Sequence, residues 1–361
     1  YDSGITEPAF SNEWLVLGMA RNGVALTDSF KDSYFQSVAK TLKENDGVLS
    51  SSRYTEYSRT ILALTALGYD PSNVGGYNLL APLADFKAVT RQGVNGAAYA
   101  LLALDSHGYE IPAVSDGKTH TTRENLVRFI LDKQLAGGGW NFSGTAADVD
   151  MTAMVIQALA PYYKTNTEVR TAVDTALALL SDRQDVNGGY ASYGDANSGS
   201  NAQVLVALTA LGVDPGADAR FLKNGHSVVD ALCAYYVGEG GFSHVADGEL
   251  NGLATTQAYY ALAAYARFQN GQTSLYDMSD VTLKAGTVPD NSNGGTTTPG
   301  SGSNDGQTAG ADNGAGESGK SDAKATNAVK TGDNAAYLAA GTGFVLAAAA
   351  FVVLAKGRKK A

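Results

Sequence analysis

Gln134-Leu135-Ala136-Gly137-Gly138-Gly139-Trp140 is the most informative stretch of this sequence, because it joins the end of an apolar helical run to a glycine turn and a large aromatic residue. Related turns stand at Gly188-Gly189-Tyr190 and Gly240-Gly241-Phe242. Glycine lets the backbone turn tightly, and the aromatic can pack back on its own unit. The recurrence, at intervals of roughly 50 residues, predicts a repeat architecture with one such loop in each repeat.

Two kinds of helix alternate on either side of these loops. One kind is apolar nearly all round and predicts a helix buried on most sides; the other carries a single apolar stripe and predicts a surface helix. The buried runs lie near 9–23, 53–67, 91–107, 148–163, 198–211 and 251–268, and the surface runs lie near 30–45, 79–87, 122–136, 167–183 and 225–238. We therefore expect residues 1–281 to form an all-α, α/α toroid, a closed ring of inner helices within outer ones, with one outer helix missing from the count.

The composition limits the classes of function. The chain has 361 residues and a formal net charge of -10, which argues against nucleic acid as a partner. The one cysteine, Cys233, excludes a disulfide framework and lies in an apolar run, so we expect it to be a small core residue.

The rest of the chain has a different composition. Residues 282–334 are rich in Gly, Ser, Thr, Asn and Asp, which predicts a flexible linker. Ala335–Ala355 carries no charge and is long enough to cross a membrane as a helix, and residues 356–361 are basic. Because basic residues stay in the cytoplasm, the toroid is expected outside the cell, at the cell surface.

The residues before this apolar segment resemble the sortase sorting signal of Gram-positive surface proteins. That signal joins a Leu-Pro-x-Thr-Gly pentapeptide to an apolar span and a basic tail. Thr331 and Gly332 match it, whereas Ala328 and Val329 stand in place of the Leu and Pro. The resemblance implies attachment to the cell wall; a simple single-pass membrane anchor is the alternative.

The glycine-aromatic loops also resemble a known repeat. Phe129-Ile130-x3-Gln134-x3-Gly138-x-Trp140 is similar to the QW repeat of squalene and hopene cyclases, and residues 179–190 are a weaker copy. The α/α toroid group also contains protein prenyltransferase β-subunits and cobalamin carriers. The nearest resemblance is to prenyltransferase/squalene-oxidase-repeat surface proteins of Gram-positive bacteria. This resemblance implies the fold but not the function, because one fold hosts many chemistries.

Asp148-Val149-Asp150-Met151-Thr152-Ala153 resembles the Asp-x-Asp-Asp-Thr-Ala signature of class II terpene cyclases. The resemblance places Asp150 at the position of the acid that protonates an alkene. Met151 replaces the third carboxylate, which argues against that chemistry. The alternative is that Asp148 caps a helix and Asp150 lies in its first turn, where backbone N–H groups would satisfy both carboxylates.

A catalytic zinc site, as in protein prenyltransferases, is not expected. Cys233 has His226 and His244 nearby in sequence, but Ala231 stands where that family has an aspartate. His107 and His120 lie in polar stretches, and we expect them to be solvated. We therefore expect no metal and no cofactor.

Polar residues at the starts of the inner helices are expected to ring one mouth of the toroid and to bind a ligand there, although helix capping is the alternative for each. The candidate ligand-binding residues are Tyr57, Arg59, Asn95, Trp140, Asp148, Asp150, Tyr190, Asn201, Phe242, Asn251 and Thr255.

The resulting hypothesis is a surface-anchored toroid that binds a ligand or partner without catalysis. The ligand would be a small hydrophobic molecule, a corrinoid or a glycan, or the partner would be a host surface protein. One alternative is a class II terpene cyclase-like enzyme that uses Asp148 and Asp150. The other is an adhesion or structural module that uses its outer face.

Overall fold

The computed structural model describes residues 7–238 and 240–287. The predicted apolar span and the sorting-signal residues Thr331 and Gly332 lie outside these ranges, as does nearly all of the predicted linker. Among the residues that are described, no helix combines the length and the apolarity that crossing a membrane requires.

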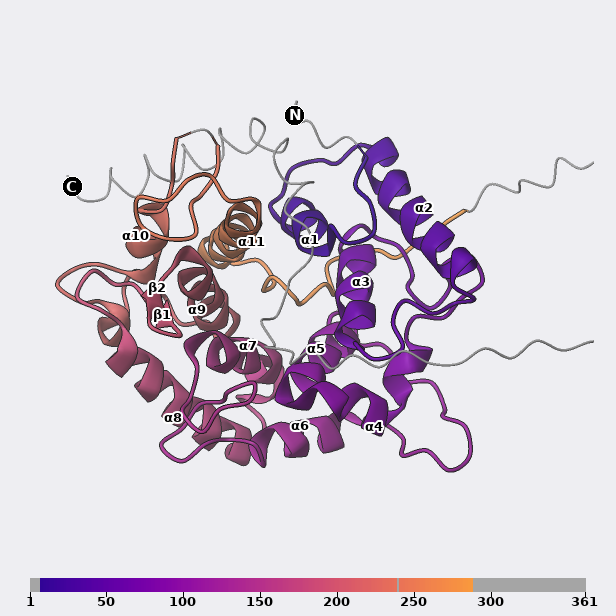
Figure 1. Cartoon of the computed structure of the whole chain (residues 1–361), viewed down its shortest axis with the longest axis horizontal. Helices are drawn as coiled ribbons and strands as arrows, with labels where there is room; N and C mark the ends of the chain where they lie inside the picture. Colours follow the sequence, from indigo (N-terminus) through magenta and orange to yellow (C-terminus); the bar gives the residue numbers. More distant parts are fainter. Residues whose placement is uncertain (1–6, 239, 288–361) are drawn as a thin grey trace, which may run out of the picture. The chain divides into compact units, whose positions relative to one another are not determined.

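Six inner helices form a closed ring (Figure 1). Each packs on the next in chain order, and the last packs back on the first. Most of their residues are buried, which confirms that the all-round apolar runs form the inner layer. The inner helices are α1 (Glu13–Arg21), α3 (Thr55–Ala66), α5 (Gly93–Asp105), α7 (Val149–Leu159), α9 (Ser198–Ala210) and α11 (Gly252–Gln269).

An outer layer surrounds the inner ring and alternates with it along the chain (Figure 1). Its helices are α2 (Asp28–Glu44), α4 (Phe86–Val89), α6 (Arg123–Leu131), α8 (Thr167–Arg183) and α10 (Val228–Cys233). Short 3-10 turns occupy Ala81–Ala84, Thr90–Gln92, Ala160–Tyr162 and Ala219–Phe221, and a two-stranded antiparallel hairpin pairs β1 (Ala191–Ser192) with β2 (Asp195–Ala196).

Three outer helices are shorter than the sequence predicted, and one of them, α6, ends at Leu131 instead of near residue 136. The run near 79–87 is divided because Pro82 lies in a 3-10 turn and Asp85 then caps a new four-residue helix. The run near 225–238 ends at Cys233, because the N–H of Val237 bonds to the carbonyl of Gly241 in the next loop (3.0 Å). The alternation of inner and outer helices makes the inner ones run in the same direction, so the ring has an N-terminal end and a C-terminal end.

The three glycine-aromatic loops occupy equivalent places, as the sequence predicted. The backbone N–H of Trp140 donates to Thr152 Oγ1 (3.0 Å), a side chain of the inner helix that follows. The N–H of Tyr190 donates to Asn201 Oδ1 (2.8 Å), and that of Phe242 donates to Thr255 Oγ1 (2.9 Å). All three aromatic side chains are fully buried.

The same loops also begin the inner helices. The carbonyls of Trp140, Tyr190 and Phe242 accept from the N–H groups of Asp148, Asn197 and Asn251, at 2.8, 3.3 and 2.9 Å. Those three residues then cap α7, α9 and α11 through their side chains. Each loop therefore buries an aromatic side chain and orients the next helix. It also satisfies part of the hydrogen-bonding capacity at the N-terminus of that helix.

The glutamine before each loop behaves differently in the two repeats that have one. Gln184 Nε2 donates to the carbonyl of Gly188 (3.0 Å), as expected for a residue that holds its own loop. Gln134 Nε2 instead donates to the carbonyl of Ala172 in α8 (2.8 Å) and joins two neighbouring outer helices. Gly188 is required at its position: its φ is +82°, and a Cβ atom would come within 2.5 Å of the Ser227 carbonyl.

Residues 272–284 follow α11 and cross the C-terminal end of the ring; we call this segment the strap. The N–H of Met278 donates to the carbonyl of Ser106 (2.7 Å) at the end of α5, and the N–H of Lys284 donates to that of Gly68 (2.7 Å) after α3. The folded chain thus continues to Lys284, slightly past the expected boundary at 281. The strap joins helices that are not neighbours in the chain.

We predict that Trp140→Ala will lower the free energy of unfolding by about 3–5 kcal/mol, because it removes a fully buried aromatic from the core. The midpoint of thermal unfolding should fall by several degrees. Phe142→Ala is the matched control, since Phe142 lies in the same loop with 47% of its surface exposed and should change stability by less than about 0.5 kcal/mol. Equal effects of the two changes would contradict the assignment of Trp140 to the core.

Candidate functional site

Asp148 caps α7, as the alternative interpretation of the sequence anticipated. Its Oδ1 accepts from the N–H of Met151 (2.9 Å), and its Oδ2 accepts from the hydroxyl of Ser192 in the β1–β2 hairpin (2.5 Å). Both oxygens of this buried carboxylate therefore have partners, and it holds the hairpin against the helix.

The environment of the Asp150 carboxyl group differs from that of Asp148. Its Oδ1 is inaccessible to solvent and makes no hydrogen bond within the described part of the chain. Burial raises the pKa of Asp150 to about 6, the nearby hydroxyl of Ser200 lowers it, and the charge of Asp148 raises it. The expectation that backbone N–H groups satisfy both carboxylates is therefore wrong for Asp150, which lies in the first turn but faces its neighbours in the ring.

Several predicted ligand-binding residues hold the fold instead. Asn201 and Thr255 bind the loop N–H groups described above, and Asn251 caps α11. Trp140, Tyr190 and Phe242 are less than 2% exposed, so their side chains lie in the core, contrary to the expectation that they line a mouth.

The remaining predicted residues, Tyr57, Arg59 and Asn95, lie near the N-terminal ends of α3 and α5. Tyr57 is buried, and its hydroxyl accepts from the N–H of Leu49 (3.0 Å). Arg59 forms an ion pair with Glu56 on its own helix. Asn95 is partly exposed. Of these three, Arg59 and Asn95 remain partly open to solvent.

Arg59 also neutralises a second acid at this end of the ring. Glu13 is buried, and its Oε1 accepts from the N–H of Ser11 (2.7 Å). Burial raises the pKa of Glu13, whereas the positive charge of Arg59 lowers it. Glu13, Glu56 and Arg59 thus form one charge cluster on the α1–α3 side of the ring. The positive charge of Arg59 offsets the repulsion between the two carboxylates.

Aromatic and amide side chains fill the middle of the ring. Trp14 of α1 contacts Tyr99 of α5, with ring centroids 5.8 Å apart, although α1 and α5 are not neighbours in the ring. Trp14 also contacts Tyr260 of α11 at 5.8 Å. On the other side, Gln157 Nε2 donates to Gln203 Oε1 (3.0 Å), and Gln203 Nε2 donates to the hydroxyl of Tyr260 (2.6 Å). We call these five residues the central layer.

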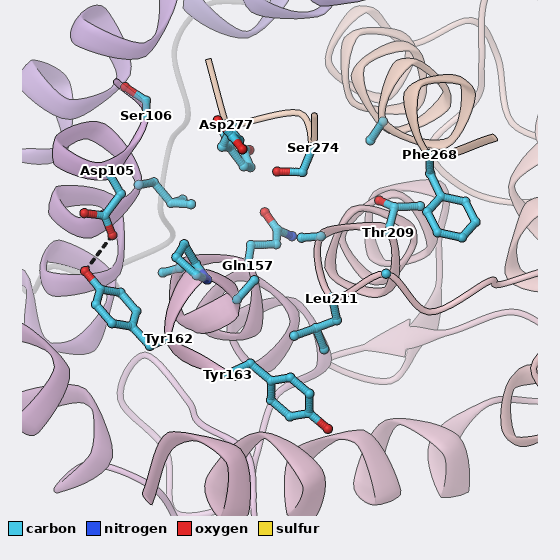
Figure 2. A pocket seen from close by; sticks show the side chains of 18 of the residues that line it. Asp105, Ser106, Gln157, Tyr162, Tyr163, Thr209, Leu211, Phe268, Ser274 and Asp277 are labelled. Carbon is cyan, nitrogen blue, oxygen red and sulfur yellow. Dashed lines mark hydrogen bonds between the residues drawn. The ribbon is translucent and has the colours of Figure 1, made fainter. Parts of the chain in front are cut away.

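A pocket of about 860 Å³ opens at the C-terminal end, below the central layer (Figure 2). The ends of α5, α7, α9 and α11 form its walls together with the strap. Its apolar lining includes Leu102, Pro161, Leu211 and Phe268, and its polar lining includes Gln157, Thr209, Ser274 and Asp277. The pocket therefore lies at the opposite end of the ring from the residues that the sequence singled out.

Two groups give the pocket its polarity. Asp105 receives hydrogen bonds from Arg123 Nε (2.6 Å) and from the hydroxyl of Tyr162 (2.7 Å), the contact drawn in Figure 2. Gln157 is 3% exposed, and its Nε2 is used within the central layer, whereas its Oε1 has no partner among the described residues. Figure 2 shows Gln157 between the walls of the pocket. A buried acceptor without a donor favours a ligand that supplies an N–H or O–H group.

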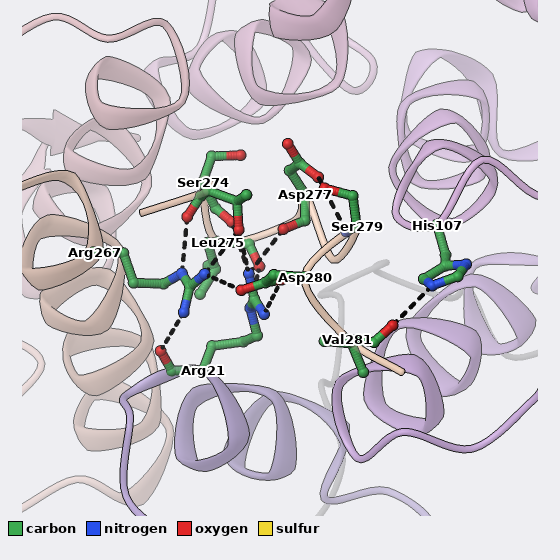
Figure 3. Close-up of polar contacts among 10 residues, drawn as sticks. Arg21, His107, Arg267, Ser274, Leu275, Asp277, Ser279, Asp280 and Val281 are labelled. Atoms are coloured by element: carbon green, nitrogen blue, oxygen red, sulfur yellow. Dashed lines mark hydrogen bonds and ion pairs between the residues drawn. The ribbon is translucent and has the colours of Figure 1, made fainter. Parts of the chain in front are cut away.

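Two arginines fix the strap that forms one wall of this pocket (Figure 3). Arg21 at the end of α1 donates to Asp280 Oδ1 (2.8 Å), and Arg267 near the end of α11 donates to Asp280 Oδ2 (2.7 Å). Arg21 also donates to the carbonyls of Leu275 (3.1 Å) and Asp277 (2.8 Å). Burial raises the pKa of Asp280, but hydrogen bonds and charge from the two guanidinium groups outweigh it, and the net pKa is lowered.

No metal centre is assembled from the residues that the structure describes, since no three His, Cys, Asp or Glu side chains gather there. Cys233 is partly exposed, and burial raises the pKa of its thiol to about 11. His107, which was expected to be solvated, is partly buried, and its Nε2 lies 3.0 Å from the carbonyl of Val281 in the strap. His120 is exposed, as expected.

Sequence reasoning missed the pocket residues Gln157, Ser274 and Asp277. One signal was present: Gln157 is the single amide in the apolar run from Met151 to Leu159. Nothing in the sequence around Ser274 or Asp277 indicated that the segment crosses the ring.

Among solved structures, ent-copalyl diphosphate synthase from Streptomyces platensis is similar to this chain, with a TM-score of 0.46 and 19% sequence identity. The match covers 73% of this chain and 50% of that one, so the chain spans about half the length of that protein. No protein-family model matches the sequence, and no curated protein is significantly similar to it. The assignment as an α/α toroid rests on the ring of helix contacts described above.

We predict that Asp150→Asn will stabilise the protein at pH 8. The folded-state pKa of about 6 lies above the ordinary value of 3.8, so the stability that the protonated side chain contributes is complete below pH 3.8 and is lost as the pH rises through 6. The asparagine cannot ionise, and it should therefore gain at most about 3 kcal/mol over the wild type at pH 8.

The measurement is chemical denaturation of both proteins at pH 4 and pH 8. The difference between them should shrink strongly at pH 4, where the wild-type carboxyl is largely protonated. A loss of about 0.5–2 kcal/mol at pH 8, as expected when a helix-capping acid is removed, would show that Asp150 is satisfied after all.

Proposed function

We propose that this chain is a binding module, without catalysis of its own, whose ligand occupies the pocket at the C-terminal end of the ring. The observation that carries the proposal is the unpartnered Oε1 of Gln157, which faces a pocket of ligand-binding size. The pocket combines apolar walls with a few polar groups that converge on one space, which suits a small molecule.

The polar groups of the pocket favour some of the ligand classes that the sequence left open and disfavour others. An isoprenoid chain offers no donor to Gln157 Oε1, which would then stay buried without a hydrogen bond. A corrinoid carries amide N–H groups and a glycan carries hydroxyls, and both also have apolar faces for Leu211 and Phe268. We therefore place the ligand among corrinoids and glycans.

Display at the cell surface remains part of the proposal. It rests on the apolar segment Ala335–Ala355, the basic residues after it, and the match of Thr331 and Gly332 to a sorting signal. An extracellular toroid would meet glycans and scarce nutrients, and it would be remote from isoprenoids made inside the cell.

We expect the double substitution of Thr331 and Gly332 by alanine to move the protein from the cell-wall fraction to the membrane fraction, because a sortase could no longer cleave the chain. Cell fractionation and immunoblotting measure this. Wall attachment that survives the substitution would exclude the sorting signal and leave only a membrane anchor.

A class II cyclase-like activity is the second candidate, and Asp150 is the observation that favours it. A carboxyl group with a raised pKa and an unpartnered oxygen can hold a proton near neutral pH. Two features oppose it: Met151 replaces the third acid, and Asp150 is not among the residues that line the pocket. Incubation with squalene or geranylgeranyl diphosphate should return both uncyclised; a cyclic product lost in Asp150→Asn would make this the function.

We predict that Gln157→Leu will weaken ligand binding in the pocket at least tenfold, because the apolar side chain fills the same space but accepts no hydrogen bond. Isothermal titration of the protein with cyanocobalamin and with neutral oligosaccharides measures the effect. Gln272→Leu, which removes an amide at the pocket rim, is the control and should cost less than threefold.

Geranylgeraniol should not bind to the wild-type protein. Geranylgeraniol binding that is unaffected by Gln157→Leu would show that the pocket is an apolar site. If none of the hydrogen-bond-donating probes binds, the pocket is not a ligand site.

A further inference from the structure

The exposed apolar side chains of this protein gather at one end of the ring. On the surface that the structure describes, six large apolar or aromatic side chains are between 39% and 82% exposed. One of them, Val24, follows α1 and so lies at the C-terminal end of the ring. The other five lie in segments that lead into inner helices, at the N-terminal end: Val48, Phe142, Val186, Tyr193 and Val245. Exposed apolar residues scattered singly are normal, whereas their concentration at one end is typical of an interaction surface.

Four of these five side chains lie in three successive repeats. Phe142, Tyr193 and Val245 each follow the buried aromatic of their own repeat by two or three positions, and they are 47%, 82% and 42% exposed. Val186 begins the same turn as Tyr193 and is 64% exposed. Each of the three repeats thus turns one aromatic inward and presents an apolar side chain outward. We call these segments the lead-in loops: residues 141–147, 185–196 and 243–250.

Hydrogen bonds join the three lead-in loops into one surface. Ser192 in the second loop donates to Asp148 Oδ2, directly after the first loop (2.5 Å). Ser198, two residues after the second loop, donates through its N–H to the carbonyl of His244 (3.0 Å) and through its hydroxyl to the carbonyl of Ser243 (2.8 Å). The second loop is therefore tied to both of the others, and the three loops form a continuous surface over the starts of α7, α9 and α11, which follow one another around the ring (Figure 1).

The backbone at Tyr193 is unfavourable for its side chain. Its φ is +53° and Gly194 follows at +97°, which is the geometry of a tight hairpin turn that normally takes Asn-Gly. A bulky residue in this left-handed region costs about 1 kcal/mol or more. An exposed side chain gains little from packing, so packing does not account for a tyrosine at this position. Tyrosine is, however, among the residues that contribute most to binding at protein interfaces.

The charge of the lead-in loops indicates what kind of partner fits them. They contain neither lysine nor arginine, but they contain four acids: Asp185, Asp195, Asp247 and Glu249. Arg183, just before the second loop, donates to the carbonyl of Ala147 in the first, and Asp182 beside it balances its charge. An acidic surface with exposed apolar side chains is complementary to a partner that carries basic and apolar side chains together.

The same charge disfavours two other occupants. A second copy of this chain, placed with its lead-in loops against the first, would bring eight carboxylates together, and the whole chain already carries a net charge of -10. A membrane surface that contains anionic lipids would repel the loops as well. A basic partner avoids both costs.

We propose that the lead-in loops are a docking surface for another protein, which binds through an exposed segment that combines lysine or arginine with apolar residues. The apolar residues of that segment pack on Phe142, Tyr193 and Val245, and its cations meet the carboxylates of the loops. Because buried aromatics and inner helices fix each loop, the surface is preformed. It lies at the opposite end of the ring from the pocket and does not depend on what the pocket binds.

The test selects peptides from a random library displayed on phage, with the full chain as the immobilised target. The selected sequences should be enriched in Lys and Arg together with aromatic or aliphatic residues. The most frequent sequence is then synthesised, and fluorescence anisotropy gives its affinity. Tyr193→Gly should weaken binding at least tenfold while thermal stability stays equal or rises, because glycine accepts the positive φ. Phe142→Ala should weaken it at least threefold.

A second variant tests the charge of the surface. The double change Asp247→Asn and Glu249→Gln removes two carboxylates, and asparagine tolerates the φ of +55° at position 247 as aspartate does. Affinity for the selected peptide should fall at least threefold at low ionic strength. The difference from the wild type should nearly vanish in about 0.5 M salt, where exposed charges are screened.

The control is Val24→Ser, which removes the exposed apolar side chain at the other end of the ring and should leave peptide affinity within twofold. The proposal is overturned if no peptide is selected, if the selected peptides are acidic, or if Tyr193→Gly binds them as tightly as the wild type. Two further results would also overturn it. One is a dimer in sedimentation velocity that Tyr193→Gly abolishes, and the other is binding to phosphatidylglycerol vesicles that Tyr193→Gly abolishes.

Discussion

Closure of the inner ring is the constraint on which the rest of this structure depends. Each inner helix is apolar on nearly every side, and it is buried only when it has an inner neighbour on both flanks and an outer helix behind it. Contact between α11 and α1 supplies the last pair of neighbours, and Arg21, Arg267 and Asp280 reinforce that seam. A buried arginine pair around one carboxylate is stable because backbone carbonyls of the strap accept the remaining N–H groups.

The glycine-aromatic loops and the strap give the two ends of the ring different characters. At the N-terminal end, each loop positions the next inner helix through its buried aromatic, so the polar residues there are mostly engaged in capping. Asp150 and Ser200 are among the exceptions. At the C-terminal end, the strap crosses the ring and leaves a pocket on the side of α7 and α9.

The fold could be predicted from the sequence because its signals are local and repeated. Gly139-Trp140 and its two counterparts reveal the period, and all-round apolar runs reveal the inner helices. The capping role of Asp148 could also be predicted, since an acid before an apolar run is a common helix start. The functional sites could not be predicted from local signals in the same way. The environment of Asp150 depends on which side chains of α9 reach it, and the pocket combines Gln157 with residues more than a hundred positions away. The turn at Tyr193-Gly194 lacks the sequence that usually marks a hairpin. The apolar pattern near residues 79–87 favoured one helix, but Pro82 divides it.

The position of the strap at the end of the folded chain has a consequence for biosynthesis. Arg21 is made early, whereas Asp280, its ion-pair partner, follows some 260 residues later, so the ring cannot be closed until almost the whole toroid has been synthesised. Until then the growing chain is an open arc, and the repeats at its two ends expose apolar helix faces. Intermediates of this kind associate with other chains or with chaperones. A chain that is exported before it folds would cross the membrane with all six inner helices unprotected. The ring can therefore be completed only after the strap has been synthesised.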